Sequence, residues 1–160
     1  MKFATSAADL PDIAKMRDLS GLEFMQAMQS GDLPAPPIAQ GMNYDLDTVE
    51  DGRVVFRGTP RFAHLNPMGG LHGGWYGTLL DSCMACAVMT KVPTGSTYTT
   101  LEYKINIVRA LPADTEIMAI GQVSHAGRTT GVATGEIRGA SDDRLYATGS
   151  TTCLIMALPV

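Results

Sequence analysis

The sequence lacks any hydrophobic run long enough to cross a lipid bilayer. All of its apolar stretches are shorter than the roughly 18 residues that a membrane-spanning helix needs. The first residues, MKFATSAADLPDIAKM, also contain neither the continuous apolar stretch nor the small-residue cleavage site of a signal peptide. We therefore expect a cytoplasmic protein that has no membrane partner.

Positive charge is scarce and dispersed. The 160 residues contain 12 Lys and Arg against 16 Asp and Glu, a formal net charge of −4. The basic residues form no blocks, whereas a nucleic-acid-binding surface usually needs a basic patch. We expect no nucleic-acid partner, and an anionic ligand would have to be held by local groups.

Cysteine is rare as well, and its three copies suit a reducing compartment better than a disulfide framework. Cys83 and Cys86 have the C-x-x-C spacing of redox proteins. They lie inside a predicted helix, however, whereas thiol pKa values are lowered at helix starts. With no second cysteine pair and no histidine beside them, a zinc site is not expected either. We predict buried, reduced thiols and no metal.

The ordinary composition, 45% hydrophobic and 18% charged, predicts one domain with a sizeable core. We assign residues 1–41 to an N-terminal helix and a proline-rich strap, and residues 42–160 to the main part of the same structural unit. In LSGLEFMQAMQSGDL, apolar residues recur at helical spacing between Ser20, a possible cap, and Gly31. The following PAPPIAQG predicts an extended connector, because clustered prolines disfavour helix.

The main part begins with a predicted hairpin, MNYDLDTVEDGRVVFRGTP, whose turn is Asp51-Gly52 and whose first strand places Tyr44, Leu46 and Thr48 on one face. A helix apolar on most sides follows, over about residues 73–90. The rest of the chain is rich in β-branched residues between turn sequences and predicts a four-strand antiparallel meander. These elements predict an α+β fold in which five or six antiparallel strands wrap around one long helix.

The segment HLNPMGGLHGGWYGTLLDS, residues 64–82, places five glycines just before and at the start of that helix. It contains neither the Rossmann nor the P-loop glycine pattern. At a helix start, Gly73 and Gly74 would let a ligand approach unpaired backbone N–H groups, which could hold a developing oxyanion. The alternative at this point is that the glycines serve only tight packing.

Asp81 favours the catalytic interpretation, because a carboxylate in an apolar helix is costly to bury without a task. It is a candidate general base or nucleophile. Gly73 lies eight residues earlier, about 12 Å along a helix axis, so one helix cannot direct both groups at one carbon. Two helices related by a two-fold axis could place Gly73 of one subunit next to Asp81 of the other. We therefore predict an obligate dimer with two shared sites.

The motif HLNPMGGLHGGWYGTLLD resembles the H-x-N-x-x-G-x-x-H-G-G-x-x-x-x-x-x-D signature of hotdog-fold acyl-CoA thioesterases of the PaaI-like, phenylacetic-acid-degradation group. The segments YTTLEYKINIVRALPADT, VSHAGRTTGVATGEI and RLYATGSTTCLI are similar to the strands that follow in that group. The resemblance covers roughly residues 20–156. It implies a hotdog fold and thioester hydrolysis, with coenzyme A as part of the substrate and no separate cofactor.

The resemblance also implies roles for individual residues. Asn66 would orient the thioester or the attacking water, and the Gly73 N–H would polarise the thioester carbonyl. Asp81 would act as base or nucleophile across the subunit interface. Thr100 would supply a hydroxyl that positions water, in an alignment uncertain by one residue. His72 would shape and cap the site.

Five further residues are candidates for contact with the substrate or with coenzyme A: Gly74, His64, His125, Gly127 and Arg128. His64 also suits a hydrogen-bonding role within its loop. His125 and Arg128 lie on a predicted turn that borders the coenzyme A phosphates in similar proteins, and a merely solvated turn is the alternative.

We expect an acyl-CoA thioesterase for aryl-acyl or medium-chain substrates, acting as a homodimer that pairs into a homotetramer. The first helix and the strap could cover its acyl pocket. A non-catalytic acyl-CoA binding or sensing protein is one alternative. A hotdog dehydratase is a weaker one, because no histidine follows Asp81 on the helix.

Overall fold

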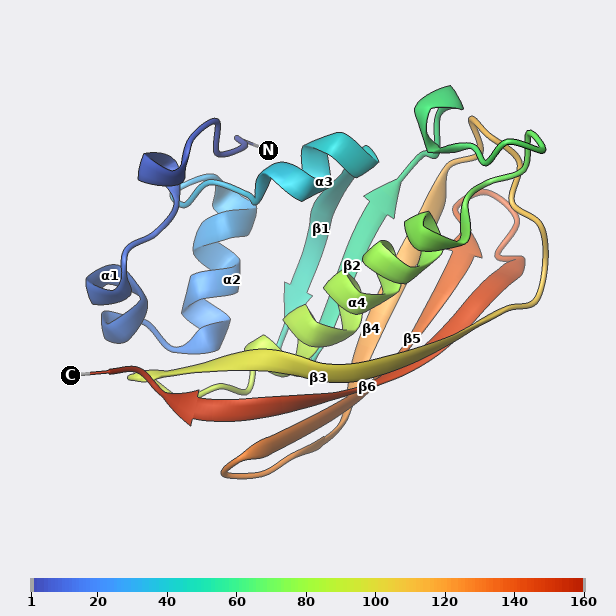
Figure 1. Cartoon of the computed structure of the whole chain (residues 1–160). Helices are drawn as coiled ribbons and strands as arrows, with labels where there is room; N and C mark the ends of the chain where they lie inside the picture. Colours follow the sequence, from blue (N-terminus) through green and yellow to red (C-terminus); the bar gives the residue numbers. More distant parts are fainter. Residues whose placement is uncertain (1, 160) are drawn as a thin grey trace.

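One antiparallel sheet of six strands curves around the long helix α4 (Gly73–Met89) in the computed structural model, which describes residues 2–159 (Figure 1). The strand order is β1-β2-β4-β5-β6-β3. Their bounds are β1 Tyr44–Glu50, β2 Arg53–Gly58, β3 Ser96–Ile107, β4 Ile117–Ala126, β5 Thr130–Gly139 and β6 Leu145–Ala157. The predicted sheet wrapped around one helix is confirmed.

The predicted four-strand meander is wrong at β3. Strands β4, β5 and β6 follow one another in the sheet, but β3 pairs with β6 and forms the edge opposite β1. The reason is that β4 has no free side: β2 pairs with it from Arg53↔Gln122 to Gly58↔Ile117, and β5 occupies its other side. β3 instead pairs along the side of β6 that β5 leaves open.

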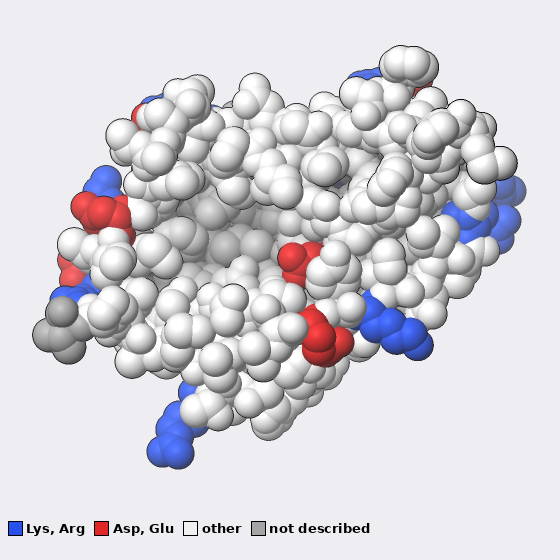
Figure 2. Space-filling model, viewed as in Figure 1, with Lys and Arg blue, Asp and Glu red and all other residues white. Residues whose placement is uncertain are grey.

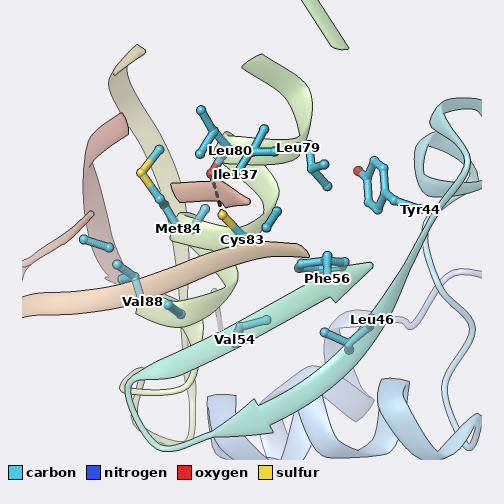
Figure 3. Packing of buried hydrophobic residues seen from close by; sticks show 14 of the residues in the cluster. Tyr44, Leu46, Val54, Phe56, Leu79, Leu80, Cys83, Met84, Val88 and Ile137 are labelled. Atoms are coloured by element: carbon cyan, nitrogen blue, oxygen red, sulfur yellow. Dashed lines mark hydrogen bonds between the residues drawn. The ribbon is translucent and has the colours of Figure 1, made fainter. Parts of the chain in front are cut away.

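Helix α4 is buried along most of its length, as its sequence predicts. Its buried residues include Trp75, Tyr76, Leu79, Leu80, Cys83, Met84, Ala87 and Val88. Figure 3 shows side chains of this helix packed with Val54 and Phe56 of β2. Gly121 of β4 permits close contact, since a Cβ there would collide with the Cys83 carbonyl. No helix within residues 2–159 is long and apolar enough to cross a membrane.

The hairpin is confirmed, with Gly52 in the turn at φ 81°. An irregularity between Leu46 and Thr48 interrupts the strict alternation that the sequence predicts. Beyond it Val49 is buried, whereas Thr48 is only partly covered. The inward face of β1 therefore continues with Val49.

The N-terminal layer consists of η1 (Ala7–Asp9), α1 (Ile13–Asp18), α2 (Gly21–Ser30) and α3 (Pro37–Met42). Helix α2 begins and ends as predicted, with the Ser20 hydroxyl accepting from the Glu23 N–H and Gly31 left-handed at φ 90°. The extended connector is wrong in part, because Pro37 begins α3 at the first helical position, where proline is tolerated. The sequence predicted neither η1 nor α1.

Candidate active site

A half-buried carboxylate lies where α4 crosses β3. Asp81 points toward this strand, and the Thr100 hydroxyl donates a 3.0 Å hydrogen bond to Asp81 Oδ1. Burial raises the pKa of Asp81 above its usual range, and the Thr100 hydrogen bond opposes that rise. A carboxyl in this state can accept a proton more readily than an exposed one, as a general base must.

The start of α4 presents one unoccupied backbone donor. His72 caps the helix: its Nδ1 accepts from the Gly74 N–H at 2.9 Å, and its carbonyl accepts from the Trp75 N–H at 3.0 Å. Among residues 2–159, no partner takes the Gly73 N–H. This donor is therefore available to an oxygen outside the helix.

Asn66 lies in the loop that leads to α4, and the loop fixes its side chain. Asn66 Oδ1 accepts from the Met68 N–H at 2.9 Å and from the Gly70 N–H at 3.1 Å. Two backbone donors identify this atom as the oxygen. The amide Nδ2 group, for which the described residues provide no partner, is left to donate elsewhere.

Gly73, Gly77 and Asp81 are spaced four residues apart and form a row along β3. A Cβ at Gly73 would stand 3.8 Å from Ile107 Cδ1, and one at Gly77 would stand 3.3 Å from the Tyr103 hydroxyl. Asp81 reaches the same strand through its hydrogen bond with Thr100. Two turns of continuous helix separate Gly73 from Asp81, so one chain does not bring them to the same reacting atom.

The remaining candidates lie in two places. His64 lies beside the start of α4, where its carbonyl accepts from the His72 N–H at 3.0 Å. His64 Nδ1 accepts from the Arg61 N–H, and Nε2 lies 2.9 Å from the Gly41 carbonyl, so both ring nitrogens have partners within the protein. His125, Gly127 and Arg128 belong to the exposed β4–β5 hairpin, at the opposite end of the sheet from the start of α4. Within one chain the structure does not bring them to Gly73.

A cavity of about 190 Å³ lies beside the C-terminal half of α4, under residues of the first helix and the strap, which is the position predicted for an acyl pocket. The hollow opens on the face shown in Figure 2, with uncharged walls and acidic groups at one rim. It is lined by Met16, Phe24, Met25, Met28, Pro36, Ala39, Tyr44, Phe56, Ser82, Cys86, Met89, Thr97 and Tyr98. The sequence did not identify its individual lining residues, and the one available indication of them was Ser82, a second polar residue beside Asp81 in an apolar helix.

Two hydroxyl groups in the wall of this cavity lie within hydrogen-bond distance of each other. Tyr44 Oη lies 2.8 Å from Ser82 Oγ, and burial raises the pKa of Tyr44 to about 12. Cys86 also lines the cavity, and burial raises its pKa to about 12. All three cysteines are free thiols, as predicted, although Cys86 is only partly buried.

Comparison with known proteins identifies the family. The sequence profile of the thioesterase superfamily matches residues 68–146. A conserved protein of known structure from Pseudomonas aeruginosa is 31% identical, with a TM-score of 0.69, over 74% of this chain and 93% of that one. The chain belongs to the thioesterase superfamily. As a member, the protein is a thioester hydrolase with the hotdog fold.

Two further structures are similar to this thioesterase-superfamily chain. A phenylacetic acid degradation-related protein from Ralstonia eutropha is 26% identical, with a TM-score of 0.75, over 82% of this chain and 98% of that one. A hypothetical thioesterase from Streptococcus pneumoniae, solved with coenzyme A, is 28% identical, with a TM-score of 0.65, over 74% of this chain and 89% of that one. No curated protein matches the sequence. The predicted resemblance to the PaaI-like group is confirmed.

Proposed function

We propose that this thioesterase-superfamily protein hydrolyses an aryl-acyl or medium-chain acyl-CoA to the free acid and coenzyme A. The observation that carries the proposal is the half-buried Asp81, held by Thr100 at the α4–β3 seam next to an apolar cavity. A binding protein would need the cavity alone. The carboxylate suits a protein that also performs chemistry on the ligand.

In the proposed reaction, Asp81 removes a proton from water as the water oxygen attacks the thioester carbon, or the carboxylate attacks that carbon itself. The carbonyl oxygen becomes negative and is stabilised by the Gly73 N–H. Asn66 Nδ2 and the Thr100 hydroxyl orient the reactants, and His72 holds the helix start. The C–S bond then breaks and coenzyme A leaves as the thiol or thiolate. If water attacked, the acyl group leaves directly as the acid; if Asp81 attacked, the acyl group is first joined to Asp81 as a mixed anhydride, which a water molecule hydrolyses to the acid and free Asp81. These groups supply every step without a cofactor.

The site is completed by a second copy of the chain in this proposal. β3 is an open sheet edge whose apolar side chains are exposed, and unpaired apolar edges are typical of interfaces. These side chains are Leu101 at 60% and Tyr103 and Ile107 at 46% exposure, and Val108, the residue after the strand, is 56% exposed. Antiparallel pairing of two β3 edges would align the Gly73–Asp81 row of each subunit with the other in the opposite direction.

Several further assignments belong to the same proposal. The dimer pairs into a tetramer and acts in the cytoplasm. His125, Gly127 and Arg128 border the coenzyme A phosphates, and Gly74 and His64 support the thioester end. The partner of the protein is its acyl-CoA substrate.

A panel of acyl-CoA substrates tests the function. We expect free coenzyme A release by the wild type, and a fall of about 10²–10⁴-fold in kcat/KM for Asp81→Asn, because the base is lost. Asp45→Asn, an exposed carboxylate on β1, is the matched control and should retain activity. Wild-type release no faster than that of Asp81→Asn on every substrate would refute the proposal. Saturable acyl-CoA binding without release would then indicate a non-catalytic binding protein.

A further inference from the structure

One side of the cavity beside α4 is formed by N-terminal residues that the thioesterase-superfamily profile does not cover. The thioesterase profile begins at residue 68, whereas α1, α2 and α3 all precede it. These helices and Pro36, the residue before α3, nevertheless contribute about half of the residues in the cavity wall: Met16, Phe24, Met25, Met28, Pro36 and Ala39. The N-terminal layer is therefore a part of this chain that shapes the space next to the candidate active site.

The residues that line the cavity adjoin Asp81 and its hydrogen-bond partner Thr100 on both α4 and β3. Ser82, which lines it, directly follows Asp81, and Cys86 and Met89 continue the same wall along α4. On β3, Tyr98 lines the cavity two residues before Thr100, so both side chains lie on the inner face of the sheet. A thioester carbon at Asp81 thus has the cavity as the nearest apolar space for its acyl group.

The lining restricts the chemistry of that acyl group. Among residues 2–159, no Lys, Arg, His, Asp or Glu lines the cavity, so a carboxylate at the far end of a dicarboxylic acyl group would be buried without a partner from these residues. The volume of about 190 Å³ is also small. A cavity of about 150 Å³ in another protein holds benzene. One ring with one or two more carbons, or a short alkyl chain, matches this space.

We propose that this cavity holds a neutral, compact acyl group and that Phe24 and Met28 of α2 set the upper limit of its size. The inference rests on the proposed thioesterase function. Both side chains are only partly buried and pack on the edge of the core, whereas neighbouring Met25 is almost fully buried at 1% exposure. Phe24 and Met28 can therefore be changed at lower cost to the fold than Met25.

Substitutions of opposite size at one position test the limit. Met28→Ala should enlarge the cavity and raise the decanoyl-CoA to hexanoyl-CoA ratio of kcat/KM about tenfold, since each buried methylene favours binding about fourfold. Met28→Phe should lower that ratio. Leu22→Ala is the matched control, because Leu22 packs on the core from the same helix without lining the cavity. Thermal melts of each variant establish that it is folded.

The wild type should hydrolyse phenylacetyl-CoA and hexanoyl-CoA well, and palmitoyl-CoA and succinyl-CoA poorly. A higher kcat/KM for palmitoyl-CoA or succinyl-CoA than for phenylacetyl-CoA and hexanoyl-CoA would overturn the inference while leaving the thioesterase function intact. So would Met28 variants whose substrate ratios move no further than that of Leu22→Ala. Absence of hydrolysis on every substrate would instead overturn the proposed function, and the inference with it.

Discussion

The two halves of helix α4 differ in what they contact. The first half, from Gly73 to Asp81, directs glycines and one carboxylate along β3, which is the exposed edge of the sheet. The second half, from Ser82 to Met89, directs a hydroxyl, a thiol and a thioether into a cavity under α2. We infer that the first half performs the chemistry and that the second half selects the acyl group. Changes in the first half should therefore lower the rate, whereas changes around the second half should alter substrate preference.

Among these three changes to the molecule, removal of the Gly73 N–H from the first half of α4 should lower kcat/KM the most. Gly73→Pro deletes this donor at the first helical position, where proline fits, and the extended His72 backbone at ψ 134° suits a following proline. We expect kcat/KM to fall about 10²–10³-fold, the usual contribution of one oxyanion donor. Initial rates on the best substrate of the acyl-CoA panel measure it.

Gly73→Ala is the matched control, because it keeps the N–H and its Cβ would stand at an ordinary 3.8 Å from Ile107 Cδ1. A proline variant as active as the alanine variant would show that the Gly73 N–H does not hold the oxyanion.

Loss of the Thr100 hydroxyl should have a smaller effect, of about tenfold on kcat/KM, because one hydrogen bond to a charged group is lost. Thr100→Val preserves the shape of the side chain but removes the donor to Asp81. That hydrogen bond lowers the Asp81 pKa, so its removal should raise the pKa further. The carboxylate then becomes protonated at a higher pH, and the acid limb of the pH–rate profile should move upward.

Thr100→Ser keeps a hydroxyl and should restore the wild-type acid limb. An acid limb that stays in place or moves to lower pH in Thr100→Val would show that the Thr100 hydroxyl does not control the protonation of Asp81.

The smallest effect on rate is expected at the cavity end of α4. Tyr44→Phe removes the hydroxyl that contacts Ser82 at 2.8 Å and should lower the free energy of unfolding by about 1 kcal/mol. The value of kcat/KM should stay within about a factor of three, less than 1 kcal/mol in activation free energy. Urea denaturation and steady-state kinetics measure the two quantities.

Tyr103→Phe, on the exposed β3 edge, is the control for the loss of a tyrosine hydroxyl. A rate loss for Tyr44→Phe larger than that for Thr100→Val would assign chemistry to the second half of α4 as well.

Local features of the sequence predicted the elements that local interactions determine. Ser20 and Gly31 set the ends of α2, Asp51-Gly52 set the hairpin, and the run of apolar residues set α4. The motif from His64 to Asp81 located the candidate site, because its glycines and its carboxylate are unusual next to an apolar helix.

Features that depend on distant contacts could not be predicted in this way. The position of β3 depends on the pairing of β2 with β4, whose partner residues lie about 60 or more positions apart in the chain, from Gly58↔Ile117 to Arg53↔Gln122. The Tyr44–Ser82 contact and the cavity wall also join residues far apart in the chain, and neither has a local pattern. The start of α3 at Pro37 was predicted wrongly, because the clustered prolines favoured an extended connector although a proline can also begin a helix.

Subunit mixing tests most directly whether the first half of α4 contributes to two sites. Asp81→Asn and Gly73→Pro chains are mixed in equal amounts, and their exchange is followed with distinct tags. Each heterodimer would contain one site with an intact Gly73 N–H and an intact Asp81, so activity should rise to about a quarter of the wild-type value. Fully exchanged dimers no more active than the two parent variants would contradict a site shared between subunits.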